Sequence, residues 1–219
     1  MKKIIRNWTM IAIIDYKAGN LTSVERAVRK LGYPCKVTNK ARDIKSAERI
    51  IFPGVGAAGQ AMADLKALGL DNLIREAFLG GKPILGICLG TQIILEYSEE
   101  NDTTCLGLVP GRVRLFSQPL MEGDTRLKIP HMGWNGMKIV RPHPVFSGVE
   151  AGSEFYFVHS YYPVPADDNY IAGLTGYGRE FASAVAYKNL VALQCHPEKS
   201  GRVGLKVLDN FCRWDGYAQ

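Results

Sequence analysis

Long apolar runs are missing from this 219-residue sequence. A helix that crosses a bilayer needs about 20 mostly apolar residues, and the longest candidate near the start, residues 10–14, ends at Asp15. The basic residues at the N-terminus are not followed by the apolar segment of a secretory signal. We therefore expect a cytoplasmic protein that does not interact with a membrane.

Cysteine is scarce and irregularly placed. The five cysteines are odd in number and form no Cys-x-x-Cys pair, the spacing found in many zinc and redox motifs. His131, His143 and His159 have no metal-like spacing either, and we interpret them as structural or interface residues. The sequence therefore predicts free thiols, no disulfide framework, no metal and no other cofactor.

Linkers, internal repeats and low-complexity tracts are also absent. With 47% hydrophobic residues, the chain can bury one substantial core. The net charge of +6 is a weak indication of nucleic-acid binding, because Lys2, Lys3 and Arg6 precede the first recognisable element. We predict no nucleic-acid partner and one domain over residues 10–219. Residues 1–9 are expected to be an N-terminal extension, either a frayed tail or a mis-assigned start.

Apolar runs alternate with amphipathic segments from Met10 onward, which is typical of an α/β fold. The helix predicted over residues 21–31 begins with a Thr22-x-x-Glu25 capping box and ends at Gly32. The other expected helices cover residues 57–68, 71–79, 89–97 and 203–214. The expected strands cover residues 10–16, 49–52, 83–88, 111–116, 137–140, 154–159, 170–174 and 183–194.

Cys88 stands where a buried strand is expected to pass into a helix. Gly86 and Gly90 flank it, and glycines allow a sharp turn and a close approach of the backbone to a ligand. N–H groups at a helix start stabilise a thiolate and can bind the oxyanion that forms when it attacks a carbonyl. We interpret Cys88 as a nucleophile; the alternative is a small apolar residue packed at a tight turn.

A candidate base and carboxylate, His196 and Glu198, occur together at the end of another expected strand. A thiol nucleophile needs a base to move protons and a third group to orient that base. Because side chains alternate along a strand, His196 shares a face with Gln194, whereas Cys195 should point into the core. A lone His-x-Glu sequence is usually a structural pair, but together with Cys88 it predicts an acyl-transfer triad.

Three segments together resemble the class I, or triad-type, glutamine amidotransferases: Pro53-Gly54-Val55-Gly56, residues 86–92 and His196-Pro197-Glu198. The resemblance covers nearly the whole chain from residue 10. It implies a single three-layer α/β domain of flavodoxin-like type, with a central, mostly parallel sheet flanked by helices. It also implies that Cys88 attacks the side-chain amide of L-glutamine, that His196 carries a proton to the departing ammonia, and that Glu198 orients His196.

The same resemblance implies a glutamine pocket with oxyanion donors from the backbone of Val55 and Leu89. Glycines such as Gly54 and Gly56 suit a loop whose peptide approaches the substrate and rotates to present a donor. An ordinary strand-to-helix turn is the alternative for this loop. The expected substrate-binding residues are Gly54, Val55, Gly56, Leu89, Gln92, Ser160 and Tyr161.

Four segments resemble, more narrowly, the glutaminase subunits of imidazole glycerol phosphate synthase: residues 15–20, 130–135, 156–161 and 196–200. That family implies a heterodimer with a (β/α)8-barrel synthase, the cyclase subunit, which uses the ammonia in histidine biosynthesis. For Trp134, a common type of interface anchor, core packing is the alternative. The expected interface residues are Asn20, His131, Met132, Trp134 and Asn135.

Three other functions stay open at this point. The pair Lys17-Ala18 departs from the family's usual residues between Asp-Tyr and Gly-Asn, which allows a related subunit that feeds the amidation of a nucleotide-linked sugar. A cysteine peptidase on the same fold is the second, because attack on an amide needs the same three roles. A non-catalytic binding module is the third, and the complete set of nucleophile, base and carboxylate argues against it.

Overall fold

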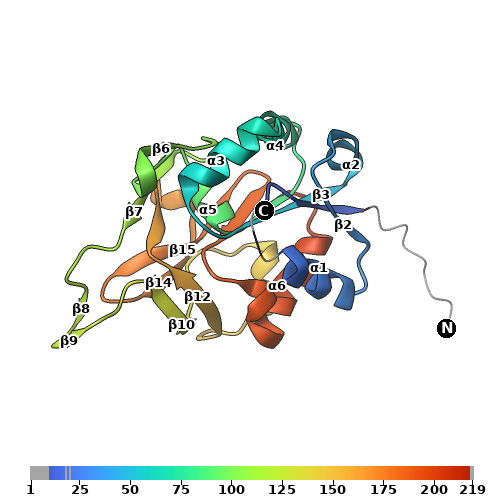
Figure 1. Ribbon diagram of the computed structural model, residues 1–219. Helices are drawn as coiled ribbons and strands as arrows, with labels where there is room; N and C mark the ends of the chain where they lie inside the picture. The colour runs from blue at the N-terminus through green and yellow to red at the C-terminus, as the bar shows by residue number, and fades with distance from the viewer. Residues whose placement is uncertain (1–9, 18, 20, 218–219) are drawn as a thin grey trace, which may run out of the picture.

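The computed structural model describes residues 10–17, 19 and 21–217. The predicted N-terminal extension, residues 1–9, and Asn20 of the predicted interface therefore lie outside the described residues. The described chain forms a central sheet with helices on both faces, which confirms the three-layer α/β arrangement (Figure 1).

The described helices are short, and none is long and apolar enough to cross a membrane. The α-helices are α1 (Leu21–Lys30), α2 (Ala41–Ser46), α3 (Ala58–Ala67), α4 (Leu70–Leu79), α5 (Leu89–Ile93) and α6 (Gly201–Arg213). The 3-10 helices are η1 (Glu100–Asp102), η2 (Pro144–Phe146), η3 (Asp168–Tyr170) and η4 (Pro197–Lys199).

The central sheet has eight strands in the order β11-β14-β15-β16-β4-β3-β1-β2. Its strands are β11 (Lys138–Ile139), β14 (Ile171–Gly176), β15 (Glu180–Tyr187), β16 (Leu190–Leu193), β4 (Ile84–Cys88), β3 (Arg49–Gly54), β1 (Ile11–Ile14) and β2 (Cys35–Thr38). From β16 to β2 neighbouring strands are parallel, and from β11 to β16 they are antiparallel. The sheet is therefore mixed, and β16 joins its two parts.

Smaller sheets lie beside the central one. The first contains, in order, β13 (Tyr161–Pro165), β7 (Gly111–Leu115), β5 (Tyr97–Ser98) and β6 (Thr103–Thr104). The others are the pairs β10 (His131–Gly136) with β12 (Glu154–His159), and β8 (Met121–Glu122) with β9 (Thr125–Arg126). The β10–β12 pair lies next to the carboxyl end of β16, where the candidate site is found. The His196 N–H, just beyond β16, donates to the Tyr156 carbonyl of β12.

Two hydrophobic cores lie on opposite faces of the central sheet. Along β1, Ile11 and Ile13 join the core that contains residues of α1 and α6, whereas Ala12 and Ile14 join the core that contains residues of α2, α3 and α4. Figure 1 shows the same division, with α1 and α6 on one side and α3 and α4 on the other. Successive side chains of one strand therefore point into different cores, one under each helical layer.

Several of the expected elements differ in extent from the observed ones. The helix after Cys88 ends at Ile93 instead of residue 97, because backbone N–H groups of residues 106–108 bind the carbonyls of residues 93–95. The strand expected over residues 183–194 is a hairpin of β15 and β16, which turns at Lys188 with a φ of 53°. The expected strand over residues 137–140 is reduced to β11, and residues 131–136, where no strand was expected, form β10.

Gly90 allows α5 to pack directly on β3, and we expect Gly90→Ala to lower the free energy of unfolding by about 3 kcal/mol. An added Cβ would lie 1.9 Å from the Phe52 carbonyl oxygen, a backbone atom that cannot turn aside as a side chain can. Urea unfolding measures the effect. Gly176→Ala is the control, because an added Cβ there meets no atom within 4 Å; equal unfolding midpoints for the two variants would contradict this packing argument.

Candidate active site

Cys88 occupies a strained turn at the end of β4. Its φ of 54° and ψ of −109° are unusual for a residue with a side chain, and α5 begins at the next residue. Such dihedrals cost free energy and persist where the surrounding structure enforces them, often at functional sites. The residue is 6% exposed. The predicted strand-to-helix position of Cys88 is thus confirmed, with a helix shorter than expected.

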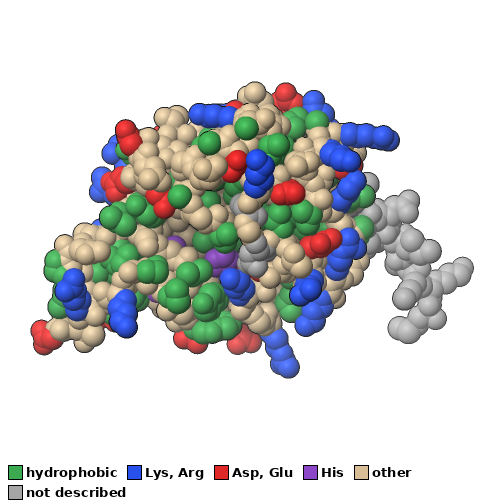
Figure 2. Space-filling view, viewed as in Figure 1, with side chains coloured by type: hydrophobic (Ala, Val, Ile, Leu, Met, Phe, Trp, Pro, Cys, Tyr) green, Lys and Arg blue, Asp and Glu red, His purple; other side chains and the backbone are tan. Residues whose placement is uncertain are grey.

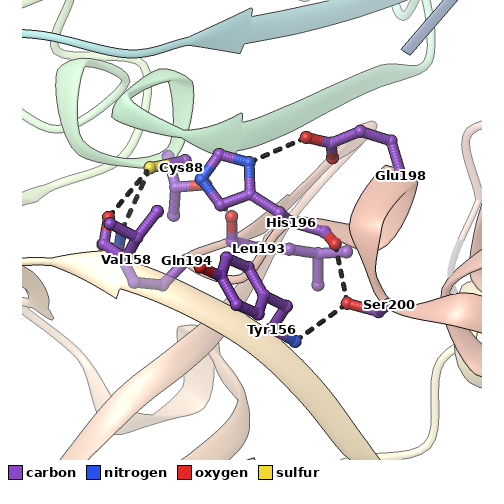
Figure 3. Close-up of polar contacts among 9 residues, drawn as sticks. Cys88, Tyr156, Val158, Leu193, Gln194, His196, Glu198 and Ser200 are labelled. Atoms are coloured by element: carbon purple, nitrogen blue, oxygen red, sulfur yellow. Dashed lines mark hydrogen bonds and ion pairs between the residues drawn. The ribbon is translucent and has the colours of Figure 1, made fainter. Parts of the chain in front are cut away.

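His196, which lies between β16 and η4, forms a buried pair with Glu198 of η4. The His196 Nδ1 and the Glu198 Oε1 are 2.8 Å apart, and the two side chains are 2% and 1% exposed. Figure 3 shows the imidazole between the two partners, with one ring nitrogen at the carboxylate and the other toward the Cys88 sulfur. The structure therefore brings the three predicted catalytic residues together in the predicted order.

The backbone of His196 is held from both sides. Its N–H donates to the Tyr156 carbonyl at 2.8 Å, and its own carbonyl accepts from the Ser200 hydroxyl at 2.6 Å. The Ser200 oxygen also accepts the Tyr156 N–H at 3.0 Å, so β12 and the start of α6 fix the ring's position (Figure 3). Ser200, two residues after Glu198, therefore ties the His196 backbone to β12.

Opposing effects set the pKa of His196. Burial lowers it, but the interactions with the Cys88 sulfur and the Glu198 carboxylate outweigh burial and raise the pKa to about 9. At neutral pH the imidazole therefore keeps a second proton next to the Cys88 sulfur. A proton held at this point can be given to a leaving amine.

The other four thiols are unsuited to nucleophilic attack at neutral pH. Burial raises the pKa of Cys35, of Cys105 to about 11 and of Cys212 to about 12. Cys195 is fully buried and points into the core as predicted, and burial raises its pKa well above the usual range. A thiol, unlike a thiolate, is a weak nucleophile, so these four are structural.

A pocket of about 410 Å³ opens over the sulfur of Cys88. Of the residues expected to bind substrate, all but Gly54 line it, and Gly54 lies just behind the wall next to Leu89. A larger cavity, about 700 Å³, near Trp214 is lined by none of the three catalytic candidates. The lining of the smaller pocket is Val55, Gly56, Cys88, Leu89, Gln92, Glu100, Pro130, Val158, His159, Ser160, Tyr161 and His196.

The buried side-chain amides of Gln92 and Gln194 connect Cys88 to one wall of the pocket. The Gln92 amide nitrogen donates to the Tyr161 carbonyl and to Gln194 Oε1, each at 3.1 Å. Gln194 is fully buried, and its own amide nitrogen lies 3.9 Å from the Cys88 sulfur. Both N–H groups of the Gln92 side-chain amide donate to the protein, so the side-chain oxygen is the group that a bound ligand can contact.

Glu100 and Gln194 belong to the site but were not predicted. Glu100 lines the pocket and accepts the Ala58 N–H at 2.7 Å. Its surroundings in the sequence, residues 99–102, read as a solvated acidic loop, so no pattern distinguishes Glu100 from Glu99. Gln194 could have been found, because it precedes His196 by two residues, the spacing at which side chains of an extended segment share a face.

The predicted interface residues divide into exposed and buried ones. Met132 and Trp134 are 62% and 54% exposed, so core packing of Trp134 is wrong. His131 is only 2% exposed and stacks on Phe157 and Tyr177, so its predicted contact with a partner requires correction: its ring belongs to the core. Figure 2 shows hydrophobic side chains gathered on the surface over β10 and β12.

The remaining histidines are neutral parts of the structure. Burial lowers the pKa of His131 to about 4 and that of His159 to about 3, and their rings are joined by a hydrogen bond of 3.0 Å. His143 is also buried, and its Nδ1 accepts the Val145 N–H. Within residues 10–217, as far as they are described, no three His, Cys, Asp or Glu side chains gather in a way that could hold a metal ion.

Comparison with known proteins defines the class to which this site belongs. A family model described as "Glutamine amidotransferase class-I" matches residues 12–213, and the chain belongs to that family. Similar proteins carry a narrower name, "Imidazole glycerol phosphate synthase subunit HisH". One, from Nitratidesulfovibrio vulgaris (strain DSM 19637 / Miyazaki F), is 53% identical over 92% of this chain and 95% of its own. Another, from Dehalococcoides mccartyi (strain ATCC BAA-2266 / KCTC 15142 / 195), is 49% identical over 92% and 96%.

Solved structures share the fold at low sequence identity. A putative GMP synthase protein from Thermoplasma acidophilum superimposes with a TM-score of 0.71 at 20% identity, covering 95% of this chain and 94% of that one. PurLQS from Thermotoga maritima gives a TM-score of 0.70 at 19% identity, covering 94% and 98%. These likenesses establish the architecture alone.

Proposed function

We propose that this protein is the glutaminase subunit of imidazole glycerol phosphate synthase, which hydrolyses L-glutamine to glutamate and ammonia. The observation that carries the proposal is that Cys88 and His196 line one pocket of about 410 Å³, a size that suits a free amino acid, while Glu198 contacts the His196 ring from behind that lining. Relatives about half identical over nearly the whole chain, all named as this subunit, support the choice of synthase.

The first half of the reaction forms a thioester. The Cys88 thiolate attacks the side-chain carbonyl carbon of glutamine, and the negative charge moves to the amide oxygen. Backbone N–H groups of Val55 and Leu89, both at the pocket wall, bind that oxyanion. The protonated His196 then donates its proton to the amide nitrogen, the carbon–nitrogen bond breaks, and ammonia leaves.

The second half restores the enzyme. Neutral His196 takes a proton from a water molecule, and the resulting hydroxide attacks the thioester carbon. The carbon–sulfur bond breaks, glutamate leaves, and the sulfur returns to the thiolate while His196 is again protonated. The Glu198 carboxylate stabilises the imidazolium, as a carboxylate does in comparable triads.

The α-amino and α-carboxylate groups of glutamine need opposite partners. The Glu100 carboxylate and the side-chain amide oxygen of Gln92 both face the pocket and suit the α-ammonium. Ser160 and Tyr161 line the wall from the end of β12 and the start of β13, where their polar groups suit the α-carboxylate. Gly54 and Gly56 keep the chain near the reacting carbon free of side chains.

We expect Glu100→Gln to raise the KM for glutamine about 10- to 100-fold, because a charged hydrogen bond to the α-ammonium is lost. The kcat should change by less than about twofold, since the reacting atoms are untouched. Steady-state glutamate release measures both constants. Glu99→Gln is the matched control, because Glu99 bonds the Leu115 N–H instead of lining the pocket; a similar KM rise in that control would argue against this role of Glu100.

A partner protein takes the ammonia. The surface formed by Met132 and Trp134, with part-exposed Asn135 beside them, is apolar and carries an aromatic anchor, as interface centres often do. We assign this surface to the synthase partner, a (β/α)8-barrel cyclase, in a heterodimer. Co-purification of this chain from its source cell, followed by mass spectrometry of what accompanies it, tests the assignment.

Incubation with L-glutamine and with peptides tests the hydrolysis itself. We expect glutamate release from glutamine, accelerated by the synthase partner and its ligand, with no cleavage of peptides. Peptide cleavage without glutamine hydrolysis would identify a peptidase and reject the proposal.

A further inference from the structure

Tyr16 has a buried hydroxyl with no hydrogen-bond partner among the described residues. The residue follows β1, is 1% exposed, and packs its ring against Phe52 with centroids 5.4 Å apart. A hydroxyl removed from water without a partner costs free energy, and such groups in folded proteins call for an explanation.

The hydroxyl lies directly behind the two proposed oxyanion donors. A Cβ added at Gly54 would sit 1.9 Å from the Tyr16 oxygen and 3.1 Å from the Leu89 Cβ. Tyr16 does not line the pocket, whereas Val55 and Leu89 do. The tyrosine oxygen therefore touches the Gly54 end of the 54–55 peptide from outside the pocket.

The hydroxyl remains a donor under working conditions. Burial, and to a smaller extent the charge of Cys88, raise the pKa of Tyr16 far above neutrality. The group keeps its proton, so an acceptor brought close to it would receive a hydrogen bond.

The planar geometry of the trans peptide between Gly54 and Val55 shows which group can be that acceptor. Its N–H and C=O groups point in opposite directions, so turning the Val55 N–H into the pocket turns the Gly54 carbonyl out of it. We propose that Tyr16 is a positioning residue for glutamine hydrolysis: its hydroxyl binds the outward Gly54 carbonyl and thereby holds the Val55 N–H on the oxyanion. The inference rests on the proposed function and extends it to a residue outside the pocket.

Tyr16→Phe tests this role, because it removes the hydroxyl and keeps the ring. In the complex with the synthase we expect kcat for glutamine hydrolysis to fall about tenfold with KM within about twofold, since the lost contact acts in the transition state. Alkylation of Cys88 by iodoacetamide should keep its wild-type rate, because that displacement of iodide by sulfur forms no oxyanion. The urea unfolding midpoint should stay the same or rise.

Tyr33→Phe is the matched control. The Tyr33 hydroxyl is bonded to Asp209 at 2.7 Å and is remote from the pocket lining, so its loss should lower the unfolding midpoint and leave kcat unchanged. A wild-type kcat in Tyr16→Phe would overturn the inference, and so would a parallel loss of alkylation, which would mean that Tyr16 acts on the thiolate. A wild-type protein that releases no glutamate would overturn the proposed function as well, which separates the two failures.

Discussion

Cys88→Ala should abolish glutamine hydrolysis, lowering kcat by about 10⁴-fold or more. Without the sulfur no thioester can form, and the imidazole and the backbone donors have no bound intermediate on which to act. The fold should persist, because alanine fits a site where the side chain is already small and 6% exposed. Glutamate release in the presence of the synthase partner measures the loss, and the urea midpoint checks the fold.

Cys35→Ala provides the matched control for this experiment. Cys35 is 5% exposed, close to the value for Cys88, but it lies on β2 and does not line the pocket. We expect this variant to keep its wild-type kcat and to lose activity on alkylation as the wild type does. Undiminished glutamate release by Cys88→Ala would reject the triad as the hydrolytic site.

Glu198→Gln should lower kcat by about 10²- to 10⁴-fold, the range that acid–base catalysis contributes. The amide can still contact the ring, but it carries no charge to stabilise the imidazolium that donates the proton. Because one chemical cycle uses all three residues, adding Glu198→Gln to Cys88→Ala should cause no further loss. A kcat within about twofold of wild type would show that Glu198 only fills space.

The same substitution should change the pH dependence of the reaction. In the wild type, kcat/KM should decline as pH rises through about 9, where His196 loses its proton. The Glu198 carboxylate is one of the groups that raise this pKa, so in Glu198→Gln the decline should begin at lower pH. Activity measured from pH 6 to about pH 10 in both proteins decides the point, and superimposable profiles would contradict the assigned role.

Stability should follow the same ionisation. The pKa of His196 is raised in the folded protein from its usual 6.5 to about 9, so the folded state binds this proton more tightly than the unfolded state. The resulting stabilisation is complete below about pH 6.5 and disappears as pH rises through about 9. The stability difference between wild type and Glu198→Gln should therefore shrink across that range.

The sequence carried enough information to predict the α/β architecture and the meeting of Cys88, His196 and Glu198. The apolar run over residues 10–16 predicts a strand, and the structure places Ile13 and Ile14 of that strand in different cores. The three residues could be recognised because distinctive residues stand beside them in the sequence: glycines flank Cys88, and a proline separates His196 from Glu198. Short motifs whose residues have a chemical role can be recognised without knowledge of the tertiary structure.

Other features depend on contacts that no local pattern records. β13 contains Pro163 and Pro165, which argue against a strand, but it is an edge strand bonded on one side to β7. The hairpin at Lys188 has no glycine to mark its turn. Glu100 reaches the pocket from a loop whose sequence looks like ordinary surface, and no local pattern shows that the Tyr16 hydroxyl lies against Gly54.

The nucleophile and the base come from adjacent parallel strands. β4 and β16 are hydrogen-bonded neighbours, with Ile87 opposite Leu193, so Cys88 and His196 follow paired positions of one ladder. Their separation therefore depends on the spacing of neighbouring strands and on the hydrogen bonds that hold the His196 backbone to Tyr156 and Ser200. Substitutions on the outer β10–β12 ribbon can alter which protein is recognised, while the spacing of sulfur and imidazole stays fixed by backbone geometry.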